Sequence, residues 1–248
     1  SNICPDRRNL GVLDVNGAFT QFICVQESLC YVLPDSVSFE AGAILEPMAV
    51  AHHAVAAASP LEGKTVLLVG AGTIGQLILK LLMLERPASV LVSDVSAEHR
   101  EMAMRNGATA TLDPSKDRWE DVLRSVGIQD GADIAIEAVG ITSTARQSVD
   151  WVKNRGQIVW VGNAEQLVSI NMQSVVTREL QIKGSYAFTG EDFSACLKLL
   201  ESGRIDPMDI VTSKIQFKDV TPMMTAMAKR ETLQIKVLAE IADSILEC

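Results

Sequence analysis

Between residues 65 and 186, short apolar runs alternate with segments of helical periodicity. Each run is nearly continuous in apolar residues, which is typical of strands that are buried on both faces. Strands that alternate with helices form parallel sheets with helices on both sides. The sequence therefore predicts a doubly wound α/β fold around a six-stranded parallel sheet. The predicted strands lie at 65–70, 90–94, 110–112, 133–137, 157–161 and 180–186.

The flanking segments have other patterns. Residues 17–25 and 29–33 mix apolar stretches with turn residues and predict strands of a small β-rich unit. Residues 39–58 predict a helix with Ser38 as its cap. Beyond residue 188, too little chain follows for a separate domain. The elements predicted there are a helix at 191–202, a strand at 211–217, a Met-rich helix at 221–229 and a strand at 233–239.

Composition excludes several classes of protein. The 248 residues contain 22 Lys and Arg against 31 Asp and Glu, a net charge of −9, which disfavours nucleic-acid binding. The longest apolar runs are too short for a membrane span of about 20 residues. Five cysteines without a C-x-x-C pair argue against a disulfide framework and for a reducing compartment. We therefore expect a cytoplasmic location and neither nucleic acid nor membrane as a partner.

A glycine-rich turn follows the first predicted strand. Gly70, Gly72 and Gly75 form a G-x-G-x-x-G pattern that also contains Thr73 and Ile74 and opens a helical run. The first glycine permits a tight turn, the second permits close approach of a pyrophosphate, and the third permits helix and strand to pack closely. The free N–H groups of the helix N-terminus favour an anion. This context predicts a dinucleotide-binding turn.

Asp94 ends the next apolar run, about 20 residues further on. A carboxylate there can accept hydrogen bonds from the two ribose hydroxyls of the adenosine half, and it would repel a 2′-phosphate. The sequence therefore favours NAD over NADP. A structural alternative is that Asp94 only caps the following helix. A flavin-binding version of the fold is a further alternative, although its glycine turn usually lies near the start of a chain.

Several further stretches, in order along the chain, resemble the zinc-type medium-chain dehydrogenases, most closely the sorbitol, polyol and threonine dehydrogenase branch. The stretches are Cys4 in Ser-Asn-Ile-Cys-Pro, Gly17 to Phe22, Tyr31 to Asp35, Glu46 to Val50 with His53-Ala54, the glycine turn, Gly107-Ala108, Glu137 to Gly140, Gly156, Val161-Gly162 and Ile182 to Ser185.

The resemblance implies reversible hydride transfer between a secondary alcohol or polyol and NAD. It implies that Ala138, Val139, Gly140, Val161 and Gly162 line the nicotinamide, and that His99 or Arg100 touches the adenosine. The implied domains are residues 1–46 as a remnant of a GroES-like catalytic domain, 47–187 as an NAD-binding Rossmann domain, and 188–248 as a segment that returns to the catalytic domain.

The resemblance also assigns zinc ligands. Glu46 is placed beside a catalytic zinc, and Cys4 resembles the last of four cysteines that bind a structural zinc. The family's other ligand motifs, a Cys followed by Asp and His and a Gly-His-Glu, are absent from this sequence. A catalytic zinc needs about three protein ligands. We therefore expect a shortened chain that binds NAD, with little or no zinc and no turnover on its own.

Two other functions stay open from the sequence. One is a complete zinc-free quinone reductase of the same fold, which would prefer NADPH. The other is a non-catalytic dinucleotide-binding or interaction protein. By resemblance, we also expect a homo-oligomer, either a dimer through the sheet edge near residues 180–186 or a tetramer.

Overall fold

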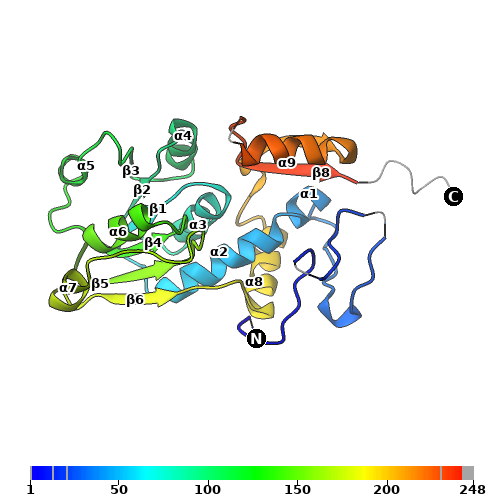
Figure 1. Ribbon diagram of the computed structural model, residues 1–248, viewed down its shortest axis with the longest axis horizontal. Coiled ribbons are helices and arrows are strands. Elements are labelled where there is room, and N and C mark those ends of the chain that lie inside the picture. The colour runs from blue at the N-terminus through cyan, green and yellow to red at the C-terminus, as the bar shows by residue number, and fades with distance from the viewer. Residues whose placement is uncertain (1, 13, 21, 230, 242–248) are drawn as a thin grey trace. The chain divides into compact units, whose positions relative to one another are not determined.

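The computed structural model describes residues 2–12, 14–20, 22–229 and 231–241. Two compact units divide the chain. One is Leu45–Cys196, and the other combines Ser1–Ile44 with Leu197–Cys248. Figure 1 labels their helices and strands in chain order. No helix among the described residues has the length and apolarity that a membrane crossing requires.

The Leu45–Cys196 unit contains a six-stranded sheet in the order β3-β2-β1-β4-β5-β6, and every neighbouring pair is parallel. This confirms the predicted doubly wound α/β fold. In register, Val69 pairs with Ser93 on one side and with Glu137 on the other, so three strands end at one edge. The strands are β1 (Thr65–Val69), β2 (Ser89–Ser93), β3 (Ala110–Leu112), β4 (Ala132–Glu137), β5 (Val152–Trp160) and β6 (Gln181–Gly184).

Helices of the same unit surround this sheet (Figure 1). The helix predicted at 39–58 is present as two pieces, α2 (Leu45–Ala58) in this unit and a short α1 (Phe39–Gly42) that belongs to the second unit and is capped by Ser38 through the N–H of Ala41. The others are α3 (Thr73–Leu84), α4 (Ala97–Arg105), α5 (Trp119–Ser125), α6 (Thr142–Asp150), α7 (Met172–Thr177) and α8 (Gly190–Glu201), whose last turns belong to the second unit.

The core lies between the central strands and the helices. On one face, Leu67 and Val69 of β1 pack in a cluster with Trp119 of α5 and Val149 of α6. The rings of Trp119 and Trp151 stack with their centroids 4.8 Å apart. Helices α2 and α3 pack against each other, and α2 also contacts β4 and β5. The strands that end at the common edge are therefore held from both faces.

The second unit joins segments from both ends of the chain. Lys214 of β7 (Val211–Gln216) forms an ion pair with Glu40 of α1, at 2.9 Å between Nζ and Oε1. Strand β7 pairs in parallel with β8 (Lys236–Glu240). The unit also contains α9 (Val220–Ala228) and three 3₁₀ turns, η1 (Glu27–Leu29), η2 (Met208–Ile210) and η3 (Phe217–Asp219).

The strands predicted at 17–25 and 29–33 are wrong. Apart from masked position 21, these residues are described, and none of them lies in a strand. Backbone hydrogen bonds within 22–33 close local turns, such as the one from the N–H of Cys30 to the carbonyl of Glu27. Phe22 is 77% exposed and Val32 is 89% exposed. An apolar stretch becomes a strand only where another backbone pairs with it, and no other described segment does so here.

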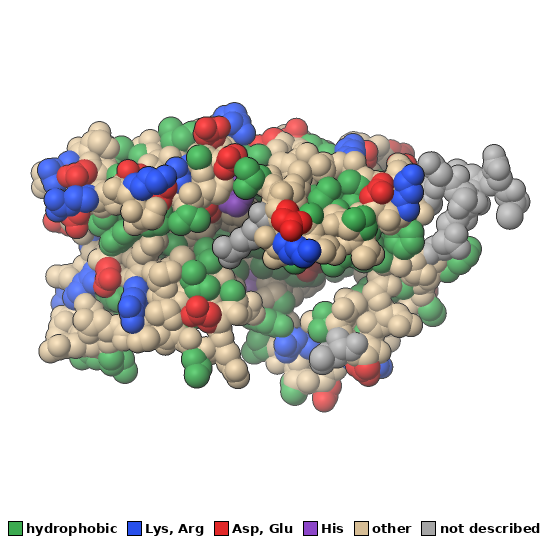
Figure 2. Space-filling view, turned by 45° about the horizontal axis from the view of Figure 1, so that its top comes forward, with side chains coloured by type: hydrophobic (Ala, Val, Ile, Leu, Met, Phe, Trp, Pro, Cys, Tyr) green, Lys and Arg blue, Asp and Glu red, His purple; other side chains and the backbone are tan. Residues whose placement is uncertain are grey.

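Charged side chains of both signs are interspersed on the face in Figure 2. Several exposed charges of the chain form ion pairs, such as Arg155 with Glu179, at 2.7 Å between Nε and Oε2. On this face, charges of the two signs are therefore mixed rather than gathered into one patch.

Leu67 of the central strand tests this account of the core. It is fully buried between the sheet and the helices, so Leu67→Ala removes contacts and leaves a cavity. We expect a loss of about 2 to 5 kcal/mol in the free energy of unfolding, measured by urea denaturation. Leu167→Ala is the matched control, because Leu167 of the same unit is 86% exposed. Equal losses in the two variants would contradict the packing described here.

Candidate functional site

The glycine turn joins β1 to α3. Helix α3 begins at Thr73, with Gly72 as its cap. A Cβ atom at Gly75 would overlap the carbonyl oxygen of Gly70, and one at Gly70 would overlap the side chain of Val139. A Cβ at Gly72 would meet nothing within 4 Å. The first and third glycines are therefore required by the chain's own packing, whereas the second leaves open space at the N-terminus of a helix.

Asp94 lies directly after β2 and is bound to this turn. Its Oδ2 accepts a hydrogen bond from the backbone N–H of Ala71 at 2.7 Å, and its Oδ1 accepts one from the N–H of Ser96 at 2.8 Å. The Nδ1 of His99 donates to Oδ2 at 3.3 Å. The side chain of Asp94 is only 11% exposed. Both ends of the predicted adenosine site, the glycine turn and the carboxylate, are thus brought together.

Asp94 and His99 shift each other's ionisation. Burial raises the pKa of Asp94, but hydrogen bonds from His99 and from the N–H groups of Ala71 and Ser96 outweigh it and hold this pKa below its ordinary value of 3.8. The hydrogen bond to Asp94 raises the pKa of His99 above 6.5 against the effect of burial. The pair is therefore favoured as carboxylate and imidazolium.

Two further side chains fix the position of this pair. Gln76 is fully buried in α3, and its Nε2 donates to the carbonyl oxygens of Ala71 at 3.1 Å and His99 at 2.9 Å. Arg100 donates from Nη1 to the carbonyl of Asp94 at 2.7 Å.

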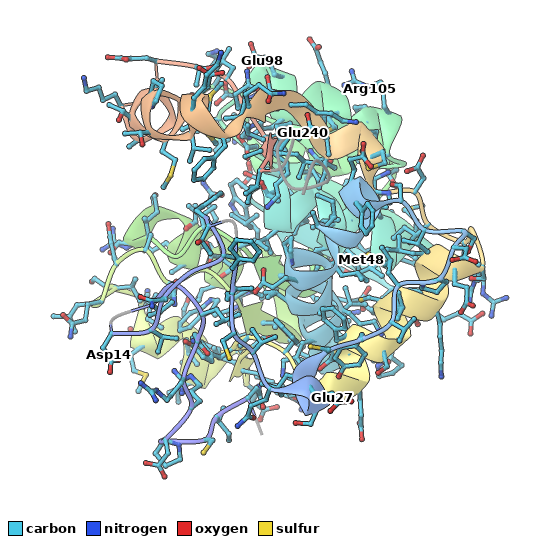
Figure 3. The ribbon with its side chains drawn as sticks, turned by 90° about the vertical axis from the view of Figure 1, so that its right-hand side faces the viewer. Asp14, Glu27, Met48, Glu98, Arg105 and Glu240 are labelled. Atoms are coloured by element: carbon cyan, nitrogen blue, oxygen red, sulfur yellow. The ribbon has the colours of Figure 1, made fainter. Side chains whose placement is uncertain are left out.

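Helix α4, which carries His99 and Arg100, has charges at both ends. Glu98 and Arg105, which Figure 3 labels, lie in its first and last turns, where they complement the helix dipole.

The sequence reasoning did not find Gln76. The signal was available, because Gln76 is a polar residue in an otherwise apolar stretch of α3. A fully buried amide needs hydrogen-bond partners, and the nearest backbone groups without helical partners are those of the glycine turn. Nothing in the sequence, however, indicated the contact with His99, which is 23 residues away along the chain.

The turns after β4 and β5 touch each other. The carboxylate of Glu137, 1% exposed, accepts hydrogen bonds from the N–H groups of Val139 at 2.9 Å and Gly140 at 2.7 Å. A Cβ at Gly140 would overlap the backbone of Asn163, and one at Gly162 would overlap that of Gly140. Only glycines fit this contact. Gly140 therefore contributes to the site by allowing these two turns to pack against each other.

These turns border a cavity of about 340 Å³ at the carboxyl edge of the sheet. Ligands of open α/β sheets bind at this edge. The sequence-predicted residues Ile74, Ala138, Val139, Val161 and Gly162 line the cavity. His99 and Arg100 are not among its lining residues and belong to the Asp94 end. The remaining lining residues are Val50, Asn163, Ala164, Ser185, Tyr186 and Ala187.

Ser185 is a buried polar residue of this cavity that the sequence did not predict. It is 7% exposed, and its Oγ has no hydrogen-bond partner among the described residues. A buried hydroxyl without a partner costs free energy unless a ligand or water satisfies it. The cavity is otherwise mostly apolar, as expected for a ring-binding pocket with few orienting groups. It therefore fits a flat heterocycle that carries a hydrogen-bonding substituent.

The predicted metal residues do not form a site in the described part of the chain. Glu46 is exposed in the first turn of α2, and Cys4 is a half-buried free thiol in the other unit. Within residues 2–12, 14–20, 22–229 and 231–241, no three His, Cys, Asp or Glu side chains converge as metal ligands. These residues alone do not fit a zinc ion, and we derive no step through one.

The His99–Asp94 pair makes stability depend on pH. Because the folded chain raises the pKa of His99 above 6.5, the pair's stabilisation is complete below 6.5 and is lost as the pH rises through the folded value. We expect the unfolding free energy of the unmodified chain to fall relative to that of His99→Gln between about pH 6 and pH 9. Urea denaturation across this range measures the difference. Parallel profiles would contradict an ion pair at this position.

Comparison with known proteins agrees with this fold. The family model described as "Zinc-binding dehydrogenase" matches residues 73–202, more than half of the chain. A probable D-xylulose reductase A from Neosartorya fischeri is 28% identical over 222 residues, which cover 88% of this chain and 62% of the relative. D-xylulose reductase A from Aspergillus niger is 26% identical with the same coverage. The chain thus spans 62% of the length of these curated relatives.

Solved structures show the same likeness. The structure of 2R,3R-butanediol dehydrogenase from Bacillus subtilis matches with a TM-score of 0.85 and 29% identity, over 96% of this chain and 68% of that one. L-idonate 5-dehydrogenase from Escherichia coli matches with a TM-score of 0.86 and 28% identity, with the same coverage of both chains. The match of the family model over more than half of the sequence establishes that the chain belongs to the zinc-binding dehydrogenase family.

Proposed function

We propose that this chain is the dinucleotide-binding part of an NAD-dependent alcohol or polyol dehydrogenase and that it binds NAD as isolated. The observation that carries the proposal is the buried Asp94 carboxylate, hydrogen-bonded to the glycine turn through the N–H of Ala71. This arrangement provides a site for a pyrophosphate at the helix N-terminus and an acceptor for ribose hydroxyls beside it.

The ionisation of Asp94 supports NAD over NADP. Its pKa lies below the ordinary value, so the group carries a full negative charge at neutral pH. A carboxylate accepts hydrogen bonds from ribose hydroxyls but repels a 2′-phosphate. The charge of His99 offsets part of this repulsion, but the carboxylate stays beside the turn through the hydrogen bond from the N–H of Ala71.

The cavity at the other end of the site supports the proposal that the nicotinamide ring binds there. Val139 and Val161 supply apolar walls, and the Ser185 hydroxyl supplies a hydrogen bond for the carboxamide. Bound NAD would supply a hydride acceptor there. The part played by this chain is to hold the ring, exclude water from one side of it and fix its orientation.

The names of the relatives support a substrate class. D-xylulose reductase and 2R,3R-butanediol dehydrogenase are named for a sugar ketone or a diol. We therefore propose a secondary alcohol with neighbouring hydroxyls as the substrate of the whole protein. The proposed chemistry is reversible transfer of a hydride between the carbinol carbon and the nicotinamide.

Calorimetric titration with NAD and with NADP tests the cofactor. We expect NAD to bind at least about tenfold more tightly than NADP, and Asp94→Asn, which keeps the shape but removes the charge, to reduce this ratio to about unity. Glu101→Gln removes an exposed carboxylate of α4 and serves as the control with an unchanged ratio. Tighter binding of NADP by the unmodified chain would overturn the assignment.

Metal analysis of the same purified sample tests the expectation that the chain holds little or no zinc. Because the described residues offer no converging set of three ligands, we expect less than one zinc per chain after dialysis, and the same value for Glu46→Gln. Elemental analysis by mass spectrometry gives the ratio. One tightly held zinc per chain, lost in Glu46→Gln, would refute this expectation and assign Glu46 as a ligand.

A further inference from the structure

Two neighbouring histidines of α2 share one carboxylate of α8. The Nδ1 of His52 donates to Oδ1 of Asp192 at 2.8 Å, and the Nδ1 of His53 donates to Oδ2 at 2.9 Å. The side chain of Asp192 is 8% exposed, whereas both imidazoles are less than one third exposed. Met48, labelled in Figure 3, lies one turn before His52 and is fully buried, so this side of α2 faces inward.

Asp192 also holds the start of α8. Its Oδ2 accepts hydrogen bonds from the N–H of Thr189 at 2.8 Å and from the Thr189 hydroxyl at 2.7 Å. In return, the N–H of Asp192 donates to Oγ1 of Thr189 at 3.3 Å. This reciprocal arrangement is a capping box, which fixes the direction in which the chain enters a helix. One carboxylate thus fastens both the first turn of α8 and the segment before it to α2.

The fastened segment forms a wall of the cavity. Ser185, Tyr186 and Ala187 line the cavity from the loop between β6 and α8, and Thr189 lies two residues after Ala187. Val50 lines the cavity from α2, two residues before His52. Two walls of the cavity therefore come from the two elements that the Asp192 carboxylate joins. Since Ser185 presents the unpartnered hydroxyl, the position of its loop decides where that hydroxyl lies.

We propose that His52, His53 and Asp192 form a latch that positions the 185–189 loop and thereby shapes the nicotinamide end of the site. These are positioning residues, because none of them lines the cavity. The inference rests on the proposed function for the identity of the ligand, but the latch itself is a property of the ligand-free chain. The proposal predicts that opening the latch weakens the binding of the nicotinamide half of the dinucleotide more than the binding of the adenosine half.

The ionisation of Asp192 fits this role. Burial raises the pKa of Asp192, but the hydrogen bonds from Thr189 and His52 and the charge of His53 outweigh it and lower this pKa to about 2. The carboxylate therefore stays ionised, so all four donors meet a charged acceptor. Cys196, one turn further along α8, is buried, and burial raises the pKa of its thiol to about 12. This thiol thus stays neutral and adds no second charge.

Titration with two ligands separates a positioning role from a general loss of structure. NADH reaches both ends of the site, whereas ADP-ribose lacks the nicotinamide. For Asp192→Asn, we expect the Kd for NADH to rise at least about fivefold and the Kd for ADP-ribose to change less than about twofold. The double variant His52→Gln, His53→Gln keeps the capping box and should show the same selective loss. Glu191→Gln, an exposed neighbour on α8, is the control with no change.

Equal weakening of both ligands, or unchanged binding of NADH, would overturn the latch. If Asp192→Asn fails to fold, the double histidine variant decides alone. Hydrogen exchange of the ligand-free chain provides a second readout. We expect the amides of residues 185–189 to exchange at least about tenfold faster in the variants than in the unmodified chain or the control. If the unmodified chain binds neither ligand, the proposed function fails, and unchanged exchange in the variants then refutes the latch separately.

Discussion

The close approach of the α3 N-terminus to the end of β1 is the contact on which the rest of the site depends. It is possible only because Gly75 has no side chain where the carbonyl of Gly70 lies. The same crowding recurs one strand away, where Gly140 and the backbone beyond Gly162 touch. At this edge, backbone therefore packs against backbone at two places. A parallel sheet concentrates such turns, because all its strands end on the same side.

Buried charge then fixes the geometry of these turns. Each of three carboxylates accepts hydrogen bonds from two or more donors. Asp94 binds the glycine turn, Glu137 binds the N–H groups after β4, and Asp192 binds two histidines and Thr189. A buried carboxylate is costly unless its oxygens are satisfied, so each of these groups strongly disfavours other conformations of its turn. The cavity therefore has a defined shape without a metal ion or a disulfide among the described residues.

The sequence predicted those parts of the molecule that depend on local pattern. All six strands of the sheet, the glycine turn and the place of Asp94 at the end of the next strand follow from apolar runs and spacing, since the strand, turn and helix are contiguous, whereas the hydrogen bond between Asp94 and the turn is seen only in the structure. The prediction was wrong at 17–33, where apolar residues suggested strands but no described segment provides the backbone partner. It missed Gln76, Ser185 and the Asp192 cluster. Asp192 lies 139 residues from His53 along the chain, and local sequence patterns do not predict a contact across such a separation.

The two ends of the site therefore differ in which parts of the chain set their geometry. The Asp94 end is built from the continuous segment 66–106, so its geometry is set by one strand-helix-strand unit and by the amide of Gln76. The cavity end combines α2, three turns and the 185–189 loop, which come together only through the complete sheet. Contacts such as the one between Gln157 of β5 and the carbonyl of Ala57 in α2, at 2.9 Å, keep those distant segments in register. Changes in sequence that alter helix packing can therefore reshape the cavity end while leaving the Asp94 end intact, because the Asp94 end depends on contacts within one continuous segment.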